Sequence, residues 1–130
     1  MPWVQVFVVF VVSHLVGDYM LQTEWQALNK RGALTGTATM RRALASHIVT
    51  YTLAFVPSLV WLWDSLHAGV LWVAAAIAIP HLIQDDGTLL GSYARTVKKA
   101  DIRANPSLGA ALDQSFHLVT LFLIALLAGH

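Results

Sequence analysis

Four long apolar runs constrain most strongly how this chain can fold. They cover residues 3–21, 43–63, 67–86 and 108–128. About 20 apolar residues rising 1.5 Å each cross a hydrocarbon core of roughly 30 Å, so each run is long enough to span a membrane as a helix. Only 12% of the residues are charged, about half the share in a soluble domain. We therefore expect an all-α, four-transmembrane-helix bundle, a single integral membrane domain over residues 1–130.

Helix breakers and caps mark where these runs bend, begin and turn. Pro57 and Pro80 lie inside two of them, where we expect each proline to kink its helix. Asn105 as N-cap and Pro106 at the first helical position mark the start of the last run. The connection at residues 64–69 is too short for anything but an antiparallel helical hairpin.

The basic residues predict an orientation. All eight lie in the two long connections: Lys30, Arg31, Arg41 and Arg42 in the first, and Arg95, Lys98, Lys99 and Arg103 in the second. By the positive-inside rule both loops are cytoplasmic and both termini face the opposite side.

Each loop also carries a short helical pattern. Leu89, Leu90, Tyr93 and Val97 recur at helical spacing between basic residues, which is typical of an amphipathic helix lying on the inner leaflet. Residues 24–31 indicate a shorter helix of the same kind. The membrane lipids are therefore expected partners of both loops.

Seven ionisable side chains interrupt the apolar runs. Each costs typically 2.5–3.5 kcal/mol within a membrane span and is a functional hypothesis by default. They are His14, Asp18, His47, His81, Asp85, Asp113 and His117. Six form pairs four residues apart, on one helix face. Counted from the cytoplasmic edge, Asp85 lies at the rim and the other six lie about 6 to 14 Å deep. The seven should therefore meet in the cytoplasmic half of the bundle.

The residue types favour a metal site. The chain has no cysteine, so metal ligands must come from His, Asp and Glu. Imidazole and carboxylate suit zinc, and also manganese or Fe(II), better than magnesium or calcium. Seven candidates exceed the four ligands of tetrahedral zinc, so either two metals lie about 3.5 to 4 Å apart or some residues orient the ligands. We favour two ions. A carboxylate that is not a ligand, Asp18 or Asp113, could act as general base.

The leading interpretation is a membrane-embedded, metal-dependent hydrolase acting on a phosphoester or on an acyl or amide substrate at the inner leaflet. Lys30, Arg41, Arg42 and Arg103 could hold an anionic substrate or headgroup at its mouth. Topology and attraction to anionic lipid also explain each of these four residues. Nucleic acid is excluded as a partner because the net charge is only +1.

Two other interpretations remain open. A metal-ion or proton transporter subunit is one, since His and Asp also mark ion pathways; four short helices would then require a homo-oligomer. The other is a non-catalytic structural or sensory protein in which the metal only staples the bundle.

Three motifs carry a resemblance to a known family. The chain reads HLVGDYMLQ from His14, followed by Thr23, Trp25 and Asn29-Lys30. This opening, with His81-xxx-Asp85 and Asp113-Gln114-xx-His117, resembles the domain of unknown function 3307 family of small bacterial and phage integral membrane proteins.

The resemblance implies a protein of the bacterial inner membrane. The family is similar in layout to predicted membrane-bound metal-dependent hydrolases, a link by analogy. Gly17 stands where the family usually has alanine, and we expect this difference to leave the site unaltered.

Overall fold

The computed structural model describes residues 1–130 as an all-α chain without strands, which confirms the all-α character expected from the sequence. Its elements follow in the order α1 (Trp3–Leu15), a π-helical turn (Val16–Met20), α2 (Glu24–Asn29), a 3-10 turn (Ala33–Thr35), α3 (Ala38–Ala54), α4 (Val56–Leu66), a 3-10 turn (His67–Gly69), α5 (Val70–Asp86), α6 (Thr88–Thr96) and α7 (Pro106–Ala128).

Three helical stretches are long and apolar enough to cross a membrane: Trp3–Met20, Val56–Asp86 and Pro106–Ala128. The first joins α1 to the π-turn, the second comprises α4 and α5 with the turn between them, and the third is α7. Asn105 caps α7 by accepting a hydrogen bond from the backbone N–H of Leu108, at 3.2 Å, so the expected start of this helix is confirmed.

The run over residues 43–63 is two helices rather than the single helix expected. The helix α3 ends before Phe55 and α4 begins after it. Pro57, near the start of α4, has no N–H to donate to the carbonyl four residues earlier, so the helical hydrogen bonding cannot continue unbroken. The N–H of Phe55 instead bonds the carbonyl of Thr52 at 3.0 Å. By contrast, Pro80 lies inside α5 without ending it.

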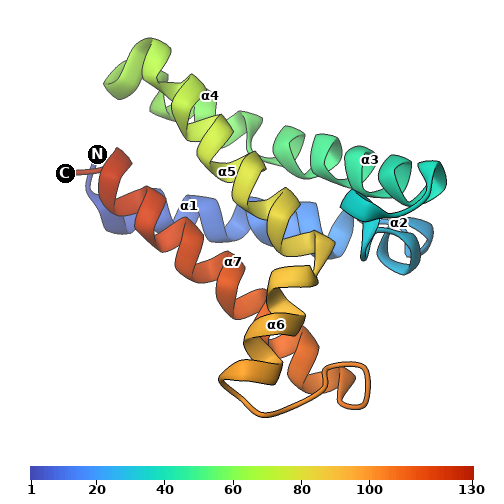
Figure 1. Ribbon diagram of the computed structural model, residues 1–130. Helices are drawn as coiled ribbons and strands as arrows, with labels where there is room; N and C mark the ends of the chain where they lie inside the picture. Colours follow the sequence, from blue (N-terminus) through green and yellow to red (C-terminus); the bar gives the residue numbers. More distant parts are fainter.

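The chain reverses direction between α4 and α5. The 3-10 turn His67–Gly69 makes the reversal, and His67 has a φ of 47°. Figure 1 shows α4 leading to this turn and α5 returning beside it. The expected helical hairpin is therefore present.

The two ends of the chain meet. The backbone N–H of His130 donates to the carbonyl of Met1 at 2.9 Å, and the His130 ring lies 3.0 Å from the N-terminal amino group. Figure 1 shows both ends together, with α1 and α7 extending away from them. The two helices pack against each other along this path.

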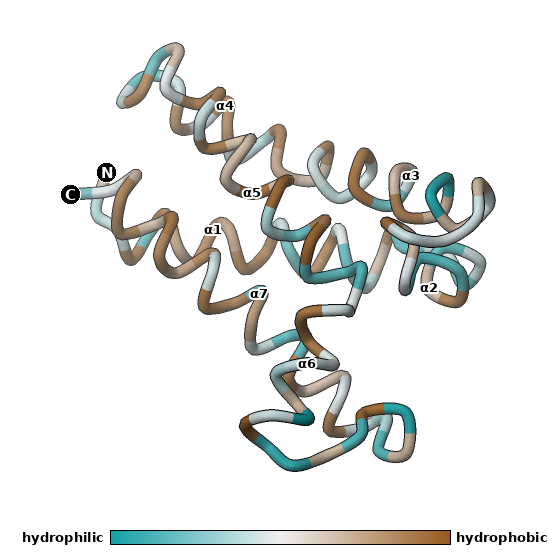
Figure 2. The backbone as a smooth tube through the Cα atoms, in the orientation of Figure 1, coloured by the Kyte–Doolittle hydropathy of each residue, from teal (hydrophilic) through white to brown (hydrophobic).

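Apolar side chains cover the outside of the bundle, and polar side chains lie within it. Leu71 and Leu127 are more than 70% exposed, whereas all seven His and Asp candidates are buried. Figure 2 shows apolar segments along α1 and α7 near the termini, and hydrophilic segments around α2 and the loop after α6. An apolar exterior around buried ionisable side chains is typical of helices that face lipid.

The buried apolar core occupies the half of the bundle near the termini. It is made of Val6, Phe10, Tyr51, Phe55, Leu62, Val70, Val73, Ile77, Leu121, Ile124, Ala125 and Ala128. The buried His and Asp side chains lie next to this core along α1, α3 and α5.

Both short helices expected in the loops are present as α2 and α6. In α6, Leu90 and Ala94 are buried, while Leu89 and the following Val97 are exposed. The helix therefore has an apolar side that the bundle does not cover. Its position on the inner leaflet stays a prediction.

Candidate metal centre

The π-helical turn brings Asp18 into the interior. Within Val16–Met20 the hydrogen bonds skip one more residue than in an α-helix, and the N–H of Leu21 bonds the carbonyl of Val16 at 2.9 Å. Asp18 is buried on this turn, while Tyr19 is 62% exposed. Turns of this kind are frequent at functional sites.

Four ligand atoms from three parts of the chain converge around one point. They are Asp18 Oδ1, His47 Nε2, His81 Nε2 and Asp85 Oδ2, and all lie within 4.8 Å of one another. His47 Nε2 lies 3.1 Å from Asp18 Oδ1, 2.8 Å from Asp85 Oδ2 and 3.1 Å from His81 Nε2. His81 Nε2 lies 3.3 Å from Asp18 Oδ1 and 3.1 Å from Asp85 Oδ2. We call these four residues the first group.

The spacing of the first group fits a bound metal ion. Ligand atoms about 2.0–2.1 Å from a tetrahedral zinc lie about 3.3 Å from one another, and five measured edges of this group run from 2.8 to 3.3 Å. Hydrogen bonds among the four atoms satisfy them poorly. Two imidazole nitrogens face each other, and Asp18 Oδ1 has no hydrogen-bond partner.

The rings of the first group are held by packing. The Nδ1 atoms of His47 and His81 have no hydrogen-bond partner. The His81 ring instead stacks on Tyr51, with ring centroids 3.6 Å apart and planes at 10°. The His117 ring also stacks on the His81 ring, with ring centroids 4.2 Å apart.

Asp18, Asp113 and His117 form a second group of ligand atoms within 4.8 Å of one another. His117 Nε2 lies 3.5 Å from Asp113 Oδ2 and 3.9 Å from Asp18 Oδ2. Its Nδ1–H donates to Gln84 Oε1 at 2.6 Å. In a neutral ring this bond leaves Nε2 as an acceptor that faces carboxylates, among them Asp85 Oδ1 at 3.0 Å. A cation between these atoms would satisfy all of them.

Asp18 belongs to both groups. Its Oδ1 faces the two imidazoles of the first group, and its Oδ2 faces His117 of the second. One carboxylate with an oxygen toward each group is the arrangement in which two metals share a ligand. Six of the seven candidates from the sequence therefore meet in two adjoining groups.

His14 lies beside the groups but in neither. Its Nδ1 is 2.9 Å from the Tyr51 hydroxyl, and its Nε2 is hydrogen-bonded to Gln114 Oε1, the acceptor, at 2.7 Å. Gln114 in turn donates from Nε2 to Asp18 Oδ2 at 3.0 Å. His14 therefore orients Asp18 through Gln114, and its role as a metal ligand stays a prediction.

Lys30 lies in the centre rather than at its mouth. Its Nζ donates to Asp85 Oδ2 at 2.7 Å, and the residue is buried. The sequence interpretation gave Lys30 to an anionic substrate or headgroup. The loop after α2 folds inward instead, which brings a positive charge to the carboxylate. The signal for this role was its place in the opening motif, next to Asn29.

Three further residues support the groups and were not assigned a role from the sequence: Tyr51, Gln84 and Gln114. All three are polar residues within apolar runs, and Tyr51 lies one helical turn after His47. That spacing could have identified Tyr51, since residues four apart share a helix face.

Asp86 ties the loop after α2 to the end of α5. Its Oδ1 accepts a hydrogen bond from the N–H of Leu34 at 2.9 Å, and its Oδ2 accepts one from the hydroxyl of Thr88 at 2.6 Å. The backbone carbonyl of Asp86 also accepts from the N–H of Gly32 at 2.8 Å. Asp86 therefore holds Lys30 near its partner, and it belongs to neither metal-binding group.

Fold and site together define an all-α protein with three candidate membrane helices and a buried His/Asp centre able to hold metal ions. The chain belongs to the family described as "Protein of unknown function (DUF3307)", whose model matches residues 6–130. The resemblance drawn from the motifs is thus confirmed over nearly the whole chain. No curated protein and no solved structure matches it.

Proposed function

We propose that this protein is a membrane-embedded, metal-dependent hydrolase with a two-metal centre, acting on a phosphoester or on an acyl or amide bond at the inner leaflet. The observation that carries the proposal is the pair of adjoining groups that share Asp18. Zinc is the preferred ion, because two imidazoles and two carboxylates make up the first group, and manganese or iron would also suit it.

The two groups differ in a way that favours catalysis at the second. Four protein ligands are typical of a structural metal, whereas three leave a position open for water or substrate. The first group offers four residues and the second offers three. A divalent metal in an open site activates water and polarises the scissile phosphoryl or carbonyl oxygen.

Asp113 is the best candidate for general base among the carboxylates. Its Oδ1 is buried without a hydrogen-bond partner, while its Oδ2 faces His117. The free oxygen can accept a proton while the other keeps its place in the second group. Asp18, the other candidate base, has both oxygens directed at the two groups, which favours a role as shared ligand.

The closed first group also supports a second function, a metal that only staples α1, α3 and α5 together. The number of ions distinguishes the two. A hydrolase with both groups filled holds two first-row metals per chain, and a stapled protein holds one.

Metal analysis of the detergent-purified protein tests the proposal. We expect two ions per chain. His117→Ala should lose one of them, and Asp18→Asn should bind both more weakly. His67→Asn is the matched control, since His67 lies on the turn between α4 and α5 and asparagine tolerates its positive φ. One ion per chain that survives in His117→Ala supports the staple, and equal metal content in all variants contradicts a site at these residues.

Metal-dependent turnover tests the hydrolase itself. We expect hydrolysis of p-nitrophenyl phosphate or p-nitrophenyl acetate by the metal-loaded protein, loss of that activity after chelation and its return on reloading. His117→Ala should remain inactive after reloading. Activity that survives chelation would contradict a metal-dependent reaction.

We also propose that the protein crosses the bacterial inner membrane four times, by α1 with its π-turn, by α3 with α4, by α5 and by α7. The hairpin at His67–Gly69 and the meeting of the chain ends support an even number of crossings. Both termini would lie outside the cytoplasm, and the metal centre would open toward the cytoplasm.

A further inference from the structure

A second polar feature lies next to the metal centre. It is a pocket of about 500 Å³ bounded by the loop after α2, the end of α5, the helix α6, and the loop that leads into α7. This volume falls within the range of small-molecule sites, about 300–1,000 Å³. Only two of its thirteen lining residues are hydrophobic, so the pocket suits a polar ligand.

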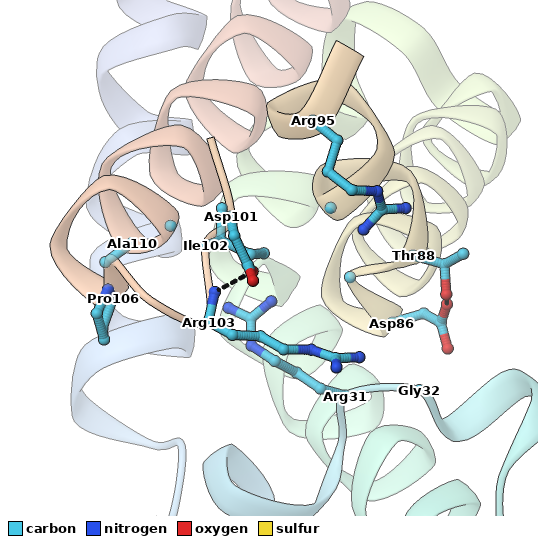
Figure 3. Close-up of a pocket in the computed structure, with 13 residues that line it drawn as sticks. Arg31, Gly32, Asp86, Thr88, Arg95, Asp101, Ile102, Arg103, Pro106 and Ala110 are labelled. Atoms are coloured by element: carbon cyan, nitrogen blue, oxygen red, sulfur yellow. Dashed lines mark hydrogen bonds between the residues drawn. The ribbon is translucent and has the colours of Figure 1, made fainter. Parts of the chain in front are cut away.

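Three arginines line the pocket from three parts of the chain: Arg31, Arg95 and Arg103. Figure 3 shows Arg95 extending from α6 on one side, with Arg31 and Arg103 extending from the two loops opposite. None of the three guanidinium groups takes part in an ion pair or hydrogen bond within the chain. Fifteen N–H donors therefore face the pocket or solvent without a protein acceptor, at about five per guanidinium.

The two carboxylates in the pocket wall accept hydrogen bonds from groups other than the arginine side chains. Asp86 accepts hydrogen bonds from the N–H of Leu34 and the hydroxyl of Thr88. Asp101 Oδ1 accepts one from the backbone N–H of Arg103 at 2.9 Å (Figure 3). With three positive and two negative side chains, the pocket has a positive excess.

At Gly87 the Arg31 guanidinium lies close to the backbone, in space that a Cβ would occupy. Gly87 has a φ of +81°, and a Cβ there would lie 2.8 Å from Arg31 Nη1. A Cβ at Gly91 would lie 3.4 Å from Arg95 Nη1. A side chain at residue 87 would therefore be strained by the positive φ and would require the end of the Arg31 side chain to shift.

The pocket and the metal centre are neighbours along α7. Gly109 lines the pocket, Asp113 follows it by four residues and His117 follows by four more. Residues four apart lie on one helix face, about 6 Å apart along the axis. On α5 the pocket and the metal centre are separated by even fewer residues. Asp86 lines the pocket, and its neighbour in the sequence, Asp85, belongs to the first group.

We propose that Arg31, Arg95 and Arg103 bind the phosphate group of a phosphate-bearing ligand. A tetrahedral phosphate offers three free oxygens to guanidinium forks, whereas a carboxylate offers two. The inference rests on the proposed function where it makes this ligand the substrate of the metal centre. The phosphate can belong to a soluble molecule or to a phospholipid headgroup, and the two sources are separated by experiment.

Binding is measured on chelator-treated, dialysed protein in detergent, so that a bound metal ion cannot account for the binding of phosphate. One arm titrates inorganic phosphate, and the other adds phosphatidic acid in mixed micelles with phosphatidylcholine. We expect a rise in the thermal midpoint with ligand and an apparent Kd at least about tenfold weaker in Arg31→Gln, Arg95→Gln or Arg103→Gln. Arg42→Gln is the matched control, because Arg42 is an exposed arginine in the first turns of α3, outside the pocket.

A response to inorganic phosphate supports a soluble ligand, and a response to phosphatidic acid alone supports a lipid. No response in either arm overturns the proposal, as does a loss in Arg42→Gln equal to that in the pocket variants. If the metal centre proposed above does not exist, phosphate binding is unchanged, because no metal is present in this assay. If the pocket does not bind phosphate, the metal content of the protein is unchanged. The two proposals can therefore fail separately.

Discussion

Asp85 contacts four charged or ionisable side chains of the centre. Its Oδ2 contacts Lys30 and both imidazoles of the first group, and its Oδ1 contacts His117. Asp18, Asp85 and Asp113 bring three carboxylates into the interior, and Lys30 brings one positive charge. The excess of negative charge favours a bound cation, since unpaired buried charges are costly.

Lys30 should therefore matter most when metal is absent. We expect Lys30→Gln to lower the free energy of unfolding of the metal-free protein by about 3–5 kcal/mol, the usual cost of removing one partner of a buried ion pair. The loss should be smaller in the metal-loaded protein, because the metal itself offsets the carboxylates. Thermal unfolding with and without chelator measures both values. Lys98→Gln, an exposed loop variant, is the control, and equal losses in the two states would contradict this role.

At Gly17 the π-helical turn lies close against Tyr51 of α3. A Cβ at Gly17 would lie 2.7 Å from Tyr51 Cδ2 and 3.2 Å from its Cα. An alanine side chain here would therefore require Tyr51 to move, whereas the expectation that glycine leaves the site unaltered stays a prediction. Tyr51 contacts His14 and stacks on His81, so the displacement would reach the centre.

We expect Gly17→Ala to cost about 1–3 kcal/mol, as overpacking usually does, and to weaken metal binding. Thermal unfolding and metal content measure the two effects. Gly69→Ala is the control, since the nearest atom to its new Cβ would be Trp72 Nε1 at an ordinary 3.4 Å. A Gly17→Ala protein as stable as the control would show that Tyr51 moves at no cost.

At the scale of elements, apolar length predicted where the helices lie but not how they end. The last helix was found from Asn105 and Pro106 because a cap and a proline are local signals. The π-turn that positions Asp18 has no such signal, since it differs from an α-helix by one hydrogen-bond step within an unbroken apolar run. The break at Phe55 was signalled by Pro57, which specifies a disruption without specifying its angle.

The cap of α7 is testable in isolation. We expect Asn105→Ala to lower the free energy of unfolding by about 1 kcal/mol, because the side-chain acceptor for Leu108 N–H is lost. Asn105→Asp should retain the stability, since aspartate caps equally well. Thermal unfolding of the two variants decides the matter, and equal destabilisation of both would assign the effect to something other than the cap.

At the scale of the whole molecule, depth along the helices predicted the centre better than any single motif. The six candidates that meet lie within four apolar runs at similar depths from the same membrane edge, and this shared depth predicted that they would come together. The inward turn of Lys30 and the presence of Arg31, Arg95 and Arg103 around one pocket could not be predicted this way. Both depend on how two loops fold over the end of the bundle, and loop paths follow from tertiary hydrogen bonds such as those of Asp86.

The proposed orientation makes a final prediction about the whole chain. Every Lys and Arg lies in the two long connections, and the chain ends meet at the other end of α1 and α7. Retention of basic loops in the cytoplasm would then place both ends outside it. Alkaline phosphatase fused after His130 should be active, and the same enzyme inserted after the exposed Lys99 should be inactive. Green fluorescent protein should give the reverse pattern, because it fluoresces only when it folds in the cytoplasm. Fluorescence from the His130 fusion would place the chain ends in the cytoplasm, and the metal centre would then open toward the outer face.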